Sequence, residues 1–76
     1  MSTVDYLRRR GEDALARGNF RQSRAHVKVL LSHALYGASN DLERESAERA
    51  ARELEISIRA AMPDWARAAA ERMAPL

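Results

Sequence analysis

The 76-residue sequence contains no cysteine, only three glycines, and just one tryptophan and one phenylalanine. Without cysteine, neither disulfides nor thiolate metal sites can form. No apolar run approaches the roughly 20 residues that a membrane-spanning helix needs, and the first residues lack the apolar segment of a signal peptide. We therefore expect a soluble, cytoplasmic protein with no role in a membrane.

Patterns that support catalysis are also missing. Three scattered glycines do not make a phosphate-binding loop. Glu12 and Asp13 are adjacent, so on a helix their carboxylates point about 100° apart and cannot act as a pair. The serines fit helix caps or helix faces, and none is arranged with a base. We expect no enzyme activity, no cofactor and no small-molecule substrate.

The two histidines, His26 and His33, are the first candidates for a metal site. Seven residues apart, they share one side of a helix but lie about 10.5 Å apart along its axis. A single metal ion needs the closer H-x₃-H spacing. We expect no metal site and interpret both histidines as packing against a third helix, with a pH-sensitive contact as the alternative.

Apolar bulk is thin, because alanine is the commonest residue. One domain of this size is near the lower limit for folding alone, and such chains often gain stability by self-association or by docking on a partner. Charge is unevenly distributed: residues 1–38 carry seven basic and three acidic residues, whereas residues 39–76 carry six and eight. Twelve of the thirteen basic residues are arginine, which suits bidentate pairing, although a GC-rich genome produces the same bias.

The clearest pattern covers residues 2–36 and predicts two antiparallel helices that meet at Gly18 and Asn19. Gly18 suits the left-handed backbone at a helix end, and Asn19 with Gln22 forms a capping box. We expect the first helix to run from Ser2 or Thr3 to about Arg17, and the second from about Phe20 to Tyr36. Each has one apolar or small-residue side, formed by Val4, Leu7, Gly11, Ala14, Leu15 and Gly18 in the first and by Phe20, Val27, Leu30, Leu31, Ala34 and Leu35 in the second.

A third helix is predicted from its cap, Asn40, to about Ala61, after a short link that begins at Gly37. Its buried side is expected to contain Ala47, Ala50, Ala51, Leu54, Ile58 and Ala61. The opposite side carries three acid-to-base pairs at i, i+4 spacing, which is typical of a solvated face: Glu45–Arg49, Glu48–Arg52 and Glu55–Arg59. Ile56 lies off the buried side and is either an isolated exposed residue or part of a contact surface.

Pro63 interrupts the third helix and suits the start of a short fourth one, over about residues 64–73. Trp65 is the largest single side chain available for burial, and we expect it to cap the core. The predicted fold class is therefore all-α. It is a small antiparallel bundle of three main helices plus a short C-terminal helix, in one domain over residues 1–76.

Residues 7–35 resemble one tetratricopeptide repeat (TPR), a helix-turn-helix unit with small residues at fixed positions. Gly11 falls where the two helices approach, Gly18-Asn19-Phe20 matches the turn, and Ser23 replaces the small alanine of the second helix. Arg10, Ala14 and Leu35 depart from the pattern, and no second copy follows. The resemblance implies protein–protein binding through a helical hairpin that is completed by a partner or by a second copy.

The leading functional hypothesis is a small adaptor or chaperone-like subunit that binds another protein, or itself as a homodimer, through an apolar helical face. The expected contacts are apolar residues outside the predicted core: Tyr6, Val29, Tyr36, Leu42 and Ile56. Val29 and Tyr36 could instead pack against the third helix.

The alternative is a nucleic-acid-binding accessory protein. It would place a basic stripe of the second helix along phosphates, namely Arg17, Arg21, Arg24 and Lys28. A solvated basic face is the simpler interpretation of that stripe, because the helix-turn-helix of DNA readers has a longer corner and helices near right angles.

Overall fold

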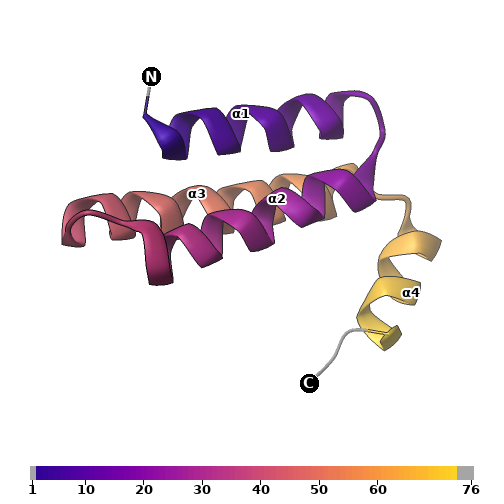
Figure 1. Cartoon of the computed structure of the whole chain (residues 1–76). Helices are drawn as coiled ribbons and strands as arrows, with labels where there is room; N and C mark the ends of the chain where they lie inside the picture. The colour runs from indigo at the N-terminus through magenta and orange to yellow at the C-terminus, as the bar shows by residue number, and fades with distance from the viewer. Residues whose placement is uncertain (1, 74–76) are drawn as a thin grey trace.

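A computed structural model of the chain describes residues 2–73 and the side chains in this range, apart from those of Trp65, Arg67, Ala70 and Met73. The described chain is helical, with short connections and no strand. Its elements are α1 (Thr3–Ala16), α2 (Phe20–Ser32), a π-helical turn η1 (His33–Gly37), α3 (Asp41–Ala61) and α4 (Asp64–Met73) (Figure 1). The first three α-helices pack against one another, which confirms the all-α bundle.

The corner between α1 and α2 is built as its sequence predicts. Gly18 adopts a positive φ of 75°, in the left-handed region that glycine tolerates best. The side-chain oxygen of Asn19 accepts a hydrogen bond from the Gln22 N–H at 3.1 Å and so caps α2. Ser2 caps α1 in the same way, with the Asp5 N–H as donor. The two helices therefore run antiparallel (Figure 1).

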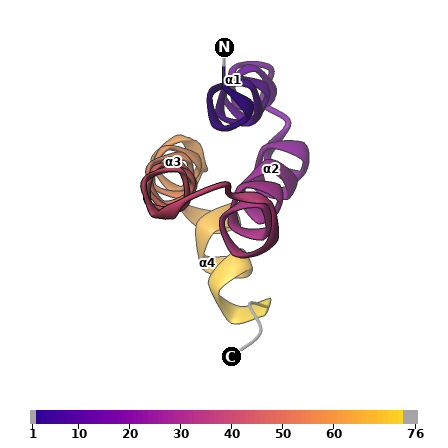
Figure 2. The same ribbon diagram turned by 60° about the vertical axis from the view of Figure 1, so that its left-hand side comes forward.

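The core lies between α1, α2 and α3, which form a triangle when viewed along the bundle (Figure 2). Small residues let the helices approach. Gly11 on α1 is buried, and a Cβ at this position would overlap Leu54 Cδ2 and lie 3.2 Å from His26 Cβ. The other buried apolar residues are Val4, Ala14, Val27, Leu30, Ala34, Ala47, Ala50, Ala51, Leu54 and Ile58.

The apolar side of α2 is only partly buried, and here the sequence-based expectation was wrong. Leu30 is fully buried, but the neighbouring Leu31 is 43 % exposed and Leu35 is 70 % exposed. The predicted apolar arc is wide, and α1 and α3 cover only the part of it that contains Val27, Leu30 and Ala34. Leu31 and Leu35 occupy the remaining part. Ala61, the last residue of α3, is also exposed rather than buried.

The two histidines occupy different environments. His33 lies in the π-helical turn, and its Nε2 donates to Glu43 Oε1 on α3 at 2.8 Å. The other oxygen of Glu43 accepts from the Ser39 N–H, and the Glu43 N–H donates to the Asn40 side chain. This cluster closes the connection between α2 and α3. His26, by contrast, lies on α2 beside Gly11 of α1, and its Nδ1 is 3.0 Å from the carbonyl oxygen of Gln22.

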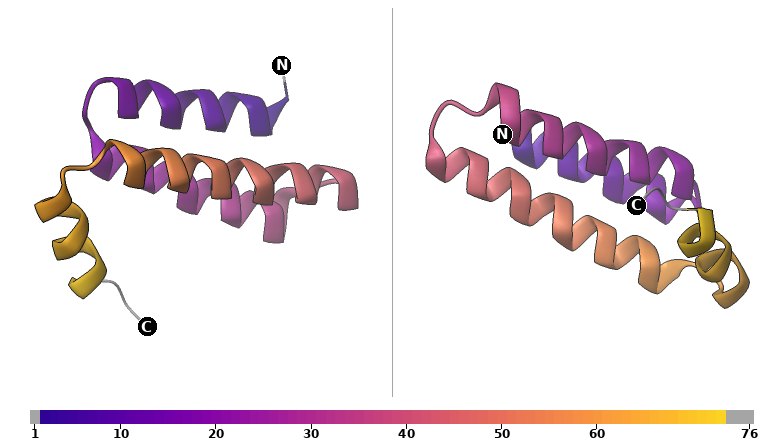
Figure 3. Two further views of the ribbon diagram at one scale, coloured as in Figure 1. Left: turned by 180° about the vertical axis from the view of Figure 1, so that it is seen from behind. Right: turned by 90° about the horizontal axis from the view of Figure 1, so that it is seen from below.

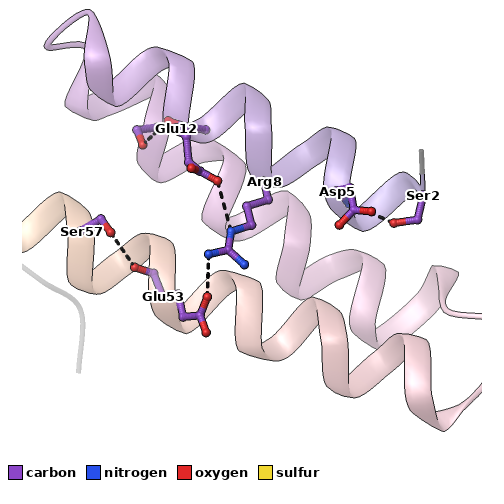
Figure 4. Close-up of polar contacts among 8 residues, drawn as sticks. Ser2, Asp5, Arg8, Glu12, Glu53 and Ser57 are labelled. Carbon is purple, nitrogen blue, oxygen red and sulfur yellow. Dashed lines mark hydrogen bonds and ion pairs between the residues drawn. The ribbon is translucent and has the colours of Figure 1, made fainter.

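On the outer side of the bundle, Arg8 links α1 to α3. Its guanidinium contacts Glu12 on its own helix at 3.1 Å and Glu53 on α3 at 2.7 Å (Figure 4). After α3, the chain turns at Pro63 and α4 leads away from the three packed helices (Figures 1 and 3). Arg59 Nη1 of α3 lies 3.8 Å from Glu71 Oε1 of α4, and this ion pair connects α4 to the end of α3. The predicted position of Trp65 over the core concerns a side chain outside the described residues.

Candidate protein-binding groove

Within the described residues, α1 packs against one side of the α2–α3 pair and does not cover the opposite side (Figure 2). A groove of about 490 Å³ runs between the two helices there. It is lined by Val27 and Leu31 from α2 and by Ala51, Arg52, Glu55, Ile56 and Arg59 from α3. α4 lies at one end of this side rather than over it (Figure 3).

Helical spacing explains how the groove is built. Val27 and Leu31 are one turn apart on α2, so their side chains follow one another along the groove. On α3, Ala51 forms the floor, and its single methyl group leaves the space between the helices unfilled. Ile56 rises on the far edge, 66 % exposed, and Arg52 and Arg59 lie one turn to either side of it. The result is an apolar floor with a charged border.

A chain of ion pairs crosses one end of the groove. Glu55 Oε1 lies 3.6 Å from Arg24 Nη2 on α2 and 3.5 Å from Arg59 Nε on α3. Arg24 also lines a smaller hollow of about 270 Å³ with Phe20, Arg21 and Met62. The ion pair between Arg24 and Glu55 therefore links a residue of the smaller hollow to a residue of the groove.

The border of the groove carries more basic than acidic side chains. Arg24 and Arg59 share the carboxylate of Glu55. Within the part of the chain that the structure describes, Arg52 and Lys28 have no carboxylate at ion-pairing distance, and both are exposed. Lys28 precedes Leu31 by three residues on α2 and Arg52 precedes Ile56 by four on α3, so one free cation stands on each flank.

The five predicted partner-binding residues are all exposed, and they lie on α1, α2, the π-helical turn η1 and α3. Ile56 lines the groove. Tyr6 lies on α1, and Val29 on α2 is not among the residues that line the groove. Tyr36 and Leu42 flank the connection between α2 and α3, and neither is among the residues that line the groove.

The predicted basic stripe is divided in the structure. Arg17 is the residue that ends α1, whereas Arg21, Arg24 and Lys28 lie on α2. Arg21 and Arg24 line the smaller hollow, and Arg24 also contacts Glu55 of the groove. The groove lining itself includes none of the four residues of the stripe.

Sequence reasoning missed three residues of the groove for two different reasons. Leu31 was assigned to the core because its position fits the apolar arc of α2. Arg52 and Arg59 were interpreted as members of solvated i, i+4 pairs, but only Glu55–Arg59 of the three predicted pairs is within ion-pairing distance among the described residues. The useful signal was Ile56 with an arginine one turn away on each side.

Other kinds of site find little support in the described chain. Residues 2–73 contain no cluster of three or more histidine, cysteine, aspartate or glutamate side chains that could hold a metal ion. Within the same residues, no helix is both long and apolar enough to cross a membrane. Comparisons of the chain with protein-family models, with curated proteins and with solved structures find no match.

Proposed function

We propose that this chain is a small protein-interaction module that binds a helix of another protein in the groove between α2 and α3. The main support is that Leu31 and Ile56 are exposed on either side of an apolar floor that no other part of the described chain covers. Laying the apolar side of a helix into a groove between two helices is a common mode of protein recognition. An adaptor or chaperone-like role fits this mode.

The proposal includes a TPR-like geometry for the first hairpin. Gly11 at the crossing of α1 and α2, Gly18 at the corner and the buried Ser23 are the positions on which the resemblance depends, and each makes a close contact or a tight turn here. In this chain α3 packs beside the second helix of the hairpin, and the groove lies between these two helices. The fourth helix is part of the same proposal, as an element beside one end of the groove. A cytoplasmic location and the absence of enzyme activity remain predictions.

Capture of a partner protein from the native host, with purified chain variants as bait, tests this function. Ile56→Asp and Leu31→Asp place a charge in the groove, whereas Ala25→Asp adds the same charge at an exposed position of α2 outside the groove lining. We expect a protein that binds the natural chain and Ala25→Asp but is lost with both groove variants. Equal binding by all four forms would overturn the proposal. Circular dichroism of each variant controls for folding.

The same purified variants also test the two alternative functions, self-association and nucleic-acid binding. A homodimer would appear in light scattering of the purified chain alone, and Ile56→Asp would convert it to a monomer. A nucleic-acid-binding protein would bind duplex DNA or RNA with an affinity that falls steeply with salt, and this binding would depend on Arg21 and Lys28 rather than on Ile56. Either result would replace helix binding as the function of the groove.

A further inference from the structure

We propose that the occupant of the groove is an acidic amphipathic helix: a short helix whose apolar stripe has aspartate or glutamate on both flanks. This inference rests on the proposed function and adds the chemistry of the partner. It follows from the dimensions of the groove, from its apolar floor and from the charges on its border.

The length of the groove sets the length of the partner helix. On α2 the relevant residues extend from Arg24 to Leu31, and on α3 from Arg52 to Arg59. Each span covers eight residues, and the seven steps between its ends correspond to about 10.5 Å or two helical turns. Two turns of a partner helix present three apolar side chains on one side, at i, i+3 or i+4, and i+7. These side chains would contact Val27, Leu31 and Ile56.

The charges on the border select the flanking residues of the partner. Lys28 stands on the α2 edge and Arg52 on the α3 edge, and neither is neutralised by a carboxylate of the described chain. Arg24 and Arg59 lie at one end, where Arg24 contacts Glu55 and Arg59 contacts both Glu55 and Glu71, so the charge of these two arginines is offset. An acidic residue on each side of the apolar stripe would pair with one free cation on each edge. A basic residue at the same place would meet like charge.

Charge also disfavours a second copy of this chain as the occupant. In a twofold dimer the same surface meets itself, so the groove of one copy would face the groove of the other. Such pairing would bring the Lys28 and Arg52 borders of the two copies together, where no carboxylate of the described residues pairs with either cation. An acidic partner avoids this repulsion.

The test uses two fluorescently labelled synthetic peptides of about 15 residues. Both have leucine at i, i+4 and i+7, and they differ only in the flanking positions, which are glutamate in one peptide and lysine in the other. Fluorescence anisotropy with the purified full chain measures affinity. We expect the glutamate peptide to bind about tenfold more tightly than the lysine peptide at low salt, with the difference shrinking at about 0.5 M salt.

Charge-reversal variants provide the decisive comparison. Lys28→Glu combined with Arg52→Glu is expected to reverse the preference toward the lysine peptide. Arg9→Glu combined with Arg10→Glu makes the same change in net charge on exposed positions of α1, across the bundle from the groove, and is expected to leave the preference intact. Ile56→Asp is expected to abolish binding of both peptides, and Ala25→Asp to abolish neither.

The outcomes separate the partner chemistry from the function itself. Equal affinity for the two peptides, with loss of both in Ile56→Asp, would overturn the acidic partner and leave helix binding in the groove standing. A preference that survives Lys28→Glu/Arg52→Glu would also overturn the inference. No binding of the glutamate peptide would overturn it as well, while capture of a host protein that depends on Ile56 would still support the function. Self-association that depends on Ile56 would identify a second copy as the occupant instead.

Discussion

The hydroxyl of Ser23 on α2 donates a hydrogen bond of 2.8 Å to the backbone carbonyl oxygen of Gly11 on α1, and both residues are buried. Leu54 of α3 packs against the same point. Three helices therefore meet around a glycine, and the bond fixes the height at which α1 crosses α2. The short side chain of Ser23 and the absence of a Cβ at Gly11 both allow this close contact. The Gly11–Ser23 contact therefore sets how closely α1 packs against α2 and α3.

Replacing Gly11 by alanine is expected to destabilise the fold, even though alanine is the better helix former. The added methyl group would overlap Leu54 Cδ2 and press on His26 Cβ. Overpacking a core costs about 1–3 kcal/mol, and the gain in helix propensity offsets about 1 kcal/mol of it. We expect a net loss of about 1 kcal/mol in the free energy of unfolding, measured by urea denaturation.

The double variant Gly11→Ala/Leu54→Ala checks the cause of this loss. Shortening Leu54 creates a cavity that the new methyl group can partly fill, so the double variant should be less destabilised than the sum of the two single variants. Strictly additive losses would show that the two positions do not interact.

Adjacent apolar residues should differ sharply in their contribution to stability. Leu30 and Ile58 are fully buried, whereas Leu31 and Ile56 are exposed over the groove. Truncating a buried leucine or isoleucine to alanine typically costs about 2–5 kcal/mol, whereas most exposed substitutions stay within about 0.5 kcal/mol. We expect Leu30→Ala and Ile58→Ala to lower the unfolding midpoint strongly, and Leu31→Ala and Ile56→Ala to change it little. Large losses in the second pair would mean that the groove is filled in solution.

Stability should decline at acidic pH through Glu43. A hydrogen bond from His33, followed by one from the Ser39 N–H, lowers the pKa of the Glu43 carboxyl below its ordinary value of 4.5. The contribution is fully present above the unfolded-state pKa and is lost as the pH falls through the lowered folded-state pKa, because the carboxylate must then be protonated.

Urea denaturation of the natural chain and Glu43→Gln across this acidic range measures the effect. The stability difference between the two should be constant above the ordinary carboxyl pKa and should shrink as the pH falls below it. A difference that does not change with pH would assign the role of Glu43 to its geometry alone.

The ion pairs of Arg8 should contribute little despite their short distances (Figure 4). Arg8 and its partners Glu12 and Glu53 are all substantially exposed, and exposed pairs are worth about 0–1 kcal/mol because water and salt screen them. We expect Arg8→Met to cost less than about 1 kcal/mol, with the cost falling as salt is added. A larger, salt-independent loss would point to packing of the arginine stem against α3.

Local signals were enough to place the helices. Gly18 needs a left-handed backbone, Asn19 and Asn40 offer side-chain acceptors to the first free amides of α2 and α3, and Pro63 interrupts the chain after α3. Each effect acts over a few residues, so it can be recognised without the fold. The one local surprise is the π-helical turn at His33–Gly37, where the ring of His33 lies so close to Gly37 that a Cβ would meet its Nδ1 at 2.7 Å.

The groove could be predicted only in part, because burial depends on which neighbour covers which side of a helix. Ile56 stood out from its own helix as an apolar residue away from the buried side. Leu31 could not be separated from Leu30 by spacing, since both belong to one apolar arc and only the placement of α1 and α3 decides which is covered. The pairing of Arg24 with Glu55 joins residues far apart in the sequence and has no local signal.

The sequence by itself determined the number of helices in the bundle, their caps and the tight turn between α1 and α2, because these depend on backbone conformation and on hydrogen bonds within a few residues. Only the tertiary structure decided which apolar residues remain in contact with water. Burial is a property of pairs of surfaces, and α1 covers one side of α2 and α3 while leaving Leu31 and Ile56 uncovered on the other.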